Sequence, residues 1–326
     1  MNEQLINTLA EIVRSAAPLL IAAQGELITE RAGVVNLSLD GTILLSAMAG
    51  FAVALETGST ETGILAAMIV GMVVALIIIL TNITLGVNQI AVGFVLTILC
   101  ADMSTFLGRD YANLPGGDVE IPYVPVPLLA DIPVIGQIFF QHNLMVYFSF
   151  VLTFVLWFYI YRTGPGLGLR ALGERPATAY VRGARVQLMR VAYVAIGGSL
   201  VGLAGAAYSL DVQLGWREDL TLGQGWIALA IVIFGTWKPY RILFGAYLIV
   251  GLRALALYLQ RQDQLTLPVH VINMTPWFLM LLTLMFVASG FAERLLVFVP
   301  PPWRPAARRF LRSDPPAALG TRFVRD

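Results

Sequence analysis

Long apolar runs alternate with short polar segments along the chain, and most of the runs have the length of a membrane span. A helix needs roughly 20 mostly apolar residues to cross the hydrocarbon core of a bilayer. The pattern predicts an all-α polytopic membrane protein with about 8–9 transmembrane helices, some of them broken by polar residues. The runs lie at about residues 9–28, 37–55, 64–81, 89–107, 143–161, 190–210, 222–236, 241–259 and 274–291.

The first run is the least regular of the nine. Arg14, Pro18 and Glu26 interrupt it, so it is either a weak span or a segment at the membrane surface. If it spans, the count of nine places the first residues outside the cell and the last residues inside. If it only dips into the membrane, the count is eight.

Composition excludes a soluble protein and points away from an enzyme. Of 326 residues, 13% are charged, whereas soluble domains carry about 25%, and the mean hydropathy is +0.77. The lone Cys100 is a packing residue, and His142 and His270 lie in or beside outer loops, so no catalytic or metal-binding residues are predicted. The glycine-rich stretch 164–173 lacks the spacing of a phosphate-binding loop, so this chain needs no cofactor and hydrolyses no ATP.

The net charge of +1 hides a strong asymmetry. Segments 162–190 and 291–326 hold thirteen of the twenty-one basic residues, while loop 110–142 holds four acids and no Lys or Arg. Because basic loops stay in the cytoplasm, the two basic segments are predicted inside. The expected organisation is a transmembrane domain over 1–299 and a flexible basic cytoplasmic tail over 300–326, beside anionic lipid.

Segment 162–190 is the most distinctive stretch, with six arginines and one acid between two apolar runs. It is too short for a domain. Two interpretations remain open: a docking element on which a soluble partner pushes, or a basic loop that only sets the topology.

Polar residues interrupt the apolar pattern at or near membrane depth. Asn36, Asp40, Asn88 and Gln89 are the candidates. Polar groups in hydrocarbon must be paired or must line a water-filled cavity, and breaks of this kind mark the substrate path in transporters. The alternative is that these side chains cap helices or bond between helices.

The short run 222–236 begins with a polar, glycine-bearing segment. Gln224 and Trp226 stand where an amphipathic ring anchors a helix at the outer interface. The alternative is that they form a gate or a surface on which a base stacks.

Small residues mark one helix as a packing centre. Gly198 and Gly202 are four residues apart, with Gly205 nearby, so they share a helix face. This spacing allows close helix approach and says nothing about substrate.

Four segments together resemble a known family. They resemble the inner-membrane permease subunits of bacterial ABC importers, in the superfamily shared by branched-chain amino acid, simple sugar and nucleoside systems. The first segment points to the nucleoside (simple-sugar-type) branch. The resemblance extends over about residues 20–290 and rests on segments 25–41, 87–98, 166–210 and 225–239.

The resemblance implies a transport subunit for nucleosides or related ribose-containing solutes, in a bacterial inner membrane, working by alternating access. Its implied partners are a cytoplasmic ATPase that binds ATP and magnesium, a second permease (a paralogue or a copy of itself) and an extracytoplasmic substrate-binding protein. No nucleic-acid partner is expected. The coupling helix falls at about 172–184, and the residues expected to meet the ATPase are Gly173, Glu174, Arg175, Pro176, Arg182 and Arg185.

A rival class is a self-sufficient secondary transporter or channel for a small polar solute. It would need a coupling-ion site within one chain, and the sequence shows no cluster of buried acids to supply it. A membrane enzyme would need a nucleophile and a base, for which no pair is apparent.

Overall fold

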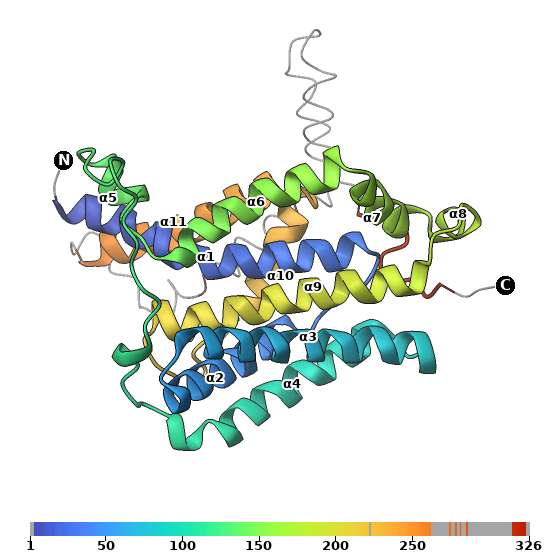
Figure 1. The fold of residues 1–326 in the computed structure, drawn as a ribbon, viewed down its shortest axis with the longest axis horizontal. Helices are drawn as coiled ribbons and strands as arrows, with labels where there is room; N and C mark the ends of the chain where they lie inside the picture. The colour runs from blue at the N-terminus through green and yellow to red at the C-terminus, as the bar shows by residue number, and fades with distance from the viewer. Residues whose placement is uncertain are drawn as a thin grey trace, which may run out of the picture.

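Helices that run between the same two ends of the molecule dominate the computed structural model (Figure 1). The regular elements in the part of the chain that the structure describes are helices, accompanied by two isolated β-bridges. The described residues are 3–221, 223–261 and 315–323, with Met274, Phe278, Leu281 and Met285.

Seven helices within the described residues are long and apolar enough to cross a membrane, which confirms an all-α polytopic membrane protein. The sixth of them continues from an α-helix into a π-helix, labelled η3. The helices are α1 (Glu3–Arg31), α2 (Leu39–Thr57), α3 (Thr60–Leu85), α4 (Gln89–Leu107), α6 (Leu144–Arg162), α9 (Val186–Ala207) with η3 (Tyr208–Val212), and α11 (Pro239–Arg261).

The two ends of the bundle carry different segments of the chain. Residues 109–143, with the short helix α5 (Ile135–Phe139), gather at the end where α1 begins, which we name the loop end (left in Figure 1). The opposite end carries α7 (Gly164–Glu174) and α8 (Pro176–Val181), and we name it the basic end. Residues 315–323, part of the segment expected to be a flexible tail, lie against the basic end.

Within the described residues, the predicted spans agree with the structure except at the run 222–236. The irregular first run is a continuous helix of 29 residues, long enough to cross. The run 222–236 yields only the 11-residue α10 (Gln224–Phe234), about 16 Å long and so about half a bilayer core. The run 274–291 lies outside the described residues, apart from four positions.

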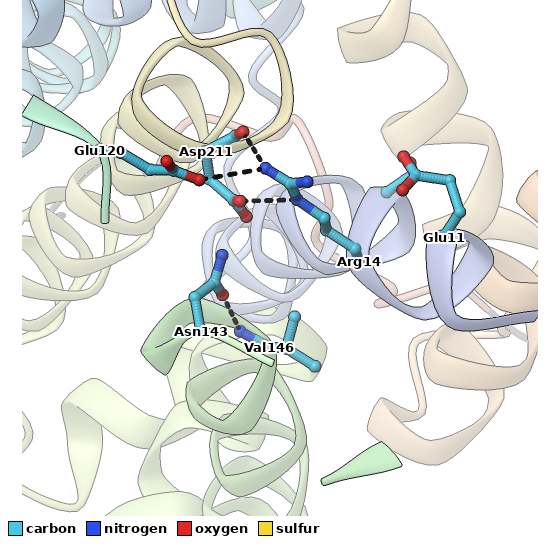
Figure 2. A network of polar contacts seen from close by, with 7 residues as sticks. Glu11, Arg14, Glu120, Asn143, Val146 and Asp211 are labelled. Carbon is cyan, nitrogen blue, oxygen red and sulfur yellow. Dashed lines mark hydrogen bonds and ion pairs between the residues drawn. The ribbon is translucent and has the colours of Figure 1, made fainter. Parts of the chain in front are cut away.

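A charged residue in α1 explains why this helix looked weak as a span. Arg14 Nε donates to Asp211 Oδ1 at 2.8 Å, and Arg14 Nη2 donates to the Asp211 carbonyl oxygen at 2.5 Å (Figure 2). Glu120, from the loop end, lies 3.6 Å from the same guanidinium. The fully buried Asp211 belongs to η3, so α1 hides its charge against the end of α9.

Helix α9 lies at the centre of the bundle, between α1 and α3 (Figure 1). Its glycines meet the backbone of neighbouring helices: a Cβ on Gly202 would collide with the Ala67 carbonyl of α3, and one on Gly205 would lie 2.6 Å from the Ile43 carbonyl of α2. Gly198 is equally close to Gly71. The predicted packing role of the three glycines is confirmed.

Replacing Gly202 by alanine should destabilise the bundle by about 1–3 kcal/mol, because α3 must move away from the added methyl group. The matched control is Gly251→Ala in α11, where an added Cβ meets no atom within 4 Å. That change should leave stability unchanged or raise it slightly. Thermal unfolding of purified protein in detergent measures both, and equal midpoints would contradict the packing assignment.

Candidate translocation path and coupling element

Residues 32–38 interrupt the helical path between α1 and α2. Asn36 is buried in this break, and its Oδ1 accepts hydrogen bonds from the Ser38 amide at 2.9 Å and the Ser38 hydroxyl at 2.6 Å. The backbone amide of Asn36 donates to Glu26 Oε1 at 3.3 Å. Asn36 therefore shapes the break, which agrees with the alternative of local hydrogen bonding.

Asp40 stands where two helices begin. It lies in the first turn of α2, and its Oδ1 accepts a hydrogen bond at 3.0 Å from the Gly225 amide, in the first turn of α10. The amides at a helix N-terminus attract negative charge. The N-terminus of α10 therefore binds a carboxylate of the protein at the first turn of α2, and in transporters with broken helices half-helix N-termini of this kind lie at the substrate site.

The segment before α10 connects this site to the loop end. Residues 213–221 leave η3 without forming a helix, and α10 begins at Gln224. Near the loop end they line a cavity of about 270 Å³ together with residues 113–115. One segment therefore runs from an open cavity at the loop end to the start of α10 beside Asp40.

Gln224 and Trp226 lie beside Asp40 and not at the loop end, where an outer-interface anchor was expected. The reason is that the chain enters the bundle before α10 begins, so the start of α10 meets the first turn of α2. Gln224 Oε1 accepts a hydrogen bond from the Tyr208 hydroxyl at 3.2 Å. The Trp226 ring lies 6.4 Å from that of Phe94, in the second turn of α4.

Phe94 was missed by sequence reasoning, because nothing distinguishes it from the other apolar residues of α4. Its side chain is 52% exposed and Trp226 is half-buried, so both rings reach the surface of this chain. Together with Asp40 and Gln224 they form a polar and aromatic group, which we name the Asp40 site.

Asn88 and Gln89 form hydrogen bonds that cap a helix and join neighbouring segments. Asn88 caps α4 by accepting a hydrogen bond from the Ile90 amide at 2.8 Å. The buried Gln89 accepts from the Val35 amide and donates to Asn82 Oδ1, both at 3.0 Å. Capping and interhelical bonding therefore account for both residues, and neither belongs to the Asp40 site.

The predicted coupling helix at 172–184 is wrong as a single helix. The structure divides it into the end of α7 and the separate helix α8, because Arg175 adopts φ −146° and ψ 75° and Pro176 opens the next helix. We name Gly164–Val181 the α7–α8 element. Val181 is 85% exposed at its tip, an apolar residue that the sequence reasoning did not single out.

The six residues proposed for coupling divide into one buried residue and five at or near the surface. Glu174, Arg175, Arg182 and Arg185 are exposed, and Pro176 is half-buried. Gly173 is buried against α1, where a Cβ would collide with the Arg31 carbonyl oxygen. The element therefore presents charge outward and is seated on the last residue of α1.

The end of α1 also clamps the turn between α10 and α11. Arg31 donates to the Trp237 carbonyl oxygen through Nε at 3.1 Å and Nη2 at 2.7 Å. The indole Nε1–H of Trp237 donates to the buried Glu30 carboxylate. Thr236 and Trp237 both adopt positive φ, a conformation that these contacts hold. This clamp was not predicted, because its partners are about 200 residues apart.

A bundle of membrane-length helices with a broken, polar interior site and a charged surface element is typical of a transport subunit. Residues 8–290 match the family described as the branched-chain amino acid transport system/permease component, and the chain belongs to this family. It is a multi-pass membrane protein and a permease component of an ABC transporter, not an enzyme.

Curated relatives cover most of the chain. It is 38% identical to the putative glucose ABC transporter permease protein TsgC13 of Haloferax volcanii, over 75% of each chain. It is 33% identical to the guanosine ABC transporter permease protein NupQ of Bacillus subtilis, over 72% of this chain and 77% of the relative. It is 31% identical to the nucleoside ABC transporter permease protein NupC of Lactococcus lactis, over 74% of this chain and 82% of the relative. No solved structure matches the chain.

Replacing Trp237 by phenylalanine should destabilise the protein by about 1–3 kcal/mol, because the buried Glu30 carboxylate loses its donor. Trp157→Phe is the matched control, since this half-buried ring of α6 contacts the Arg162 guanidinium through its face. Thermal unfolding in detergent compares the two. If both variants unfold at the same temperature, the clamp contributes nothing to stability.

Proposed function

We propose that this chain forms the translocation path for nucleosides or related ribose-containing solutes, as a permease subunit of an ATP-driven importer. The observation that carries the proposal is the Asp40 site, where a carboxylate and an amide stand beside two aromatic rings. Carboxylate oxygens accept hydrogen bonds from sugar hydroxyls, and aromatic rings stack on bases. Relatives named for guanosine and nucleoside transport support the choice, and the glucose-named relative makes a simple sugar the alternative.

The mechanism we propose is alternating access. The basic end faces the cytoplasm, and a partner ATPase binds the exposed charges of the α7–α8 element. Closure of the ATPases pushes the element against Arg31, where Gly173 is seated. The movement reaches the clamped turn at Trp237 and the break 32–38, which bound α10 and α2 around Asp40. A second permease completes the path, and an extracytoplasmic binding protein delivers the solute at the loop end.

Uptake by the reconstituted importer tests the substrate class. The chain is placed in liposomes with its partner permease, ATPase and binding protein, and labelled uridine and ribose are followed with and without ATP. ATP-dependent uridine uptake is the expected result. Ribose uptake alone would move the substrate to sugars, and uptake by this chain alone would contradict the permease-subunit role.

Trp226→Ala should lower uridine uptake about 10-fold, because loss of base stacking costs about 1–3 kcal/mol. Trp226→Phe should retain most of the activity, since it keeps a ring. Trp157→Ala removes an equal ring from α6, away from the Asp40 site, and should leave uptake unchanged. Initial rates at matched protein levels measure all three, and equal losses in Trp226→Ala and Trp157→Ala would contradict a stacking role.

Reversing the charges of Glu174 and Arg182 together should abolish ATPase binding, because both are exposed, Glu174 at the end of α7 and Arg182 directly after α8. The control is Arg217→Glu, an exposed charge before α10 near the loop-end cavity. Co-purification of the ATPase with the permease in detergent reads the result. A double variant that still binds the ATPase and drives uptake would show that coupling lies elsewhere.

A further inference from the structure

Residues 315–323 form a layer of contacts on the basic end of the bundle. Their backbone joins two separate parts of the bundle. The Ala318 amide donates to the Gly173 carbonyl of α7 at 2.7 Å, and the Gly320 amide donates to the Gly33 carbonyl at 3.1 Å. Gly33 lies in the break that leads to Asp40, and Gly173 is the residue through which the α7–α8 element contacts α1.

A buried arginine of α9 contacts both α7 and segment 315–323. Arg190, in the second turn of α9, is 2% exposed. Its Nη1 donates to the Thr321 carbonyl at 3.0 Å, and its Nη2 lies 3.4 Å from the Leu172 carbonyl of α7. A Cβ on Gly33 would lie 2.8 Å from the same Nη2, so only glycine fits there without displacing the guanidinium. One cation thus links α9, α7 and segment 315–323.

Side chains of the segment extend the contact to α8 and to the α3–α4 turn. The Phe323 ring lies 5.7 Å from that of Tyr180 in α8. Arg322 Nη2 donates to the Ile83 carbonyl at 3.3 Å, and Ala318 is 7% exposed. The segment is therefore seated among four elements by backbone, charged and aromatic contacts at once.

We propose that residues 315–323 form a strap that positions the α7–α8 element against the break before Asp40. The strap bonds to Gly173 on one side and to Gly33 on the other, so displacement of the element carries the break with it. Only six residues separate Gly33 from Asp40. This role rests on the proposed function, because it needs an ATPase that pushes on the element.

Two neighbouring alanines allow a matched test. Ala318 and Ala317 both belong to the strap, but Ala318 is buried whereas Ala317 is exposed. Ala318→Gln should release the strap and lower the solute transported per ATP hydrolysed about 5-fold, a loss within the range for residues that carry coupling. Ala317→Gln should behave as the unchanged protein. A role in stability alone would lower protein yield and unfolding temperature but would leave the ratio of transport to hydrolysis unchanged.

Docking of the strap is measured separately from transport. With Cys100→Ala as background, the pair Tyr180→Cys and Phe323→Cys should react with a short bis-maleimide in the assembled complex, and Ala318→Gln should reduce the yield. Absence of cross-linking in the double-cysteine protein that keeps Ala318 would overturn the strap. Loss of cross-linking with an unchanged transport ratio would overturn its coupling role.

Deletion of residues 315–326 provides the second variant, in case glutamine is accommodated at position 318. The deletion should lower the transport ratio as Ala318→Gln does, and an unchanged ratio would overturn the proposal. If the complete complex shows no ATP-dependent uptake at all, the proposed function fails and the coupling role fails with it. Cross-linking would still report whether the strap is seated, so the two failures are distinguishable.

Discussion

Backbone polar groups that lie inside the bundle need hydrogen-bond partners from the protein itself, and this constraint shapes the breaks between its helices. Within hydrocarbon an unpaired amide or carbonyl costs several kcal/mol. The chain breaks its helices at 32–38 and between η3 and α10, and side chains of α1, α4 and α2 accept hydrogen bonds from backbone amides in or beside these breaks. Glu26 and Gln89 accept hydrogen bonds from the Asn36 and Val35 amides of the first break. Asp40 accepts one from the Gly225 amide at the start of α10. The polar residues that look out of place in the sequence are the partners of these breaks.

The same constraint accounts for the charged residues of α1. Arg14 at one end is held by Asp211, and Glu30 and Arg31 at the other end hold Trp237. The helix therefore carries its charges where neighbouring elements end or turn, and its middle is apolar and fully buried. Because α1 touches both the loop end and the seat of the α7–α8 element, it connects the two faces continuously.

Much of the fold could be predicted from the sequence, because membrane spans and glycine packing are local signals. The hydropathy of α3 and the spacing of Gly198 and Gly202 need no knowledge of a partner. The site was harder, because its contacts join distant residues: Asp40 and Gly225 are 185 positions apart, and Arg14 and Asp211 are 197 apart. The sequence marks Asp40 and Gln224 as polar but does not show that α10 begins beside α2.

Backbone contact between helices also limits how the molecule can change shape. Where α9 meets α1 and α3, Gly197 and Gly202 lie against the carbonyl oxygens of Gly25 and Ala67, so backbone approaches backbone directly. We therefore expect α1, α3 and α9 to tilt together as one rigid unit. Helix α1 is about 43 Å long, so a tilt of about 5° around its middle displaces each end by about 2 Å. A displacement of this size at the seat of the α7–α8 element appears undiminished, and in the opposite direction, at the far side of the membrane.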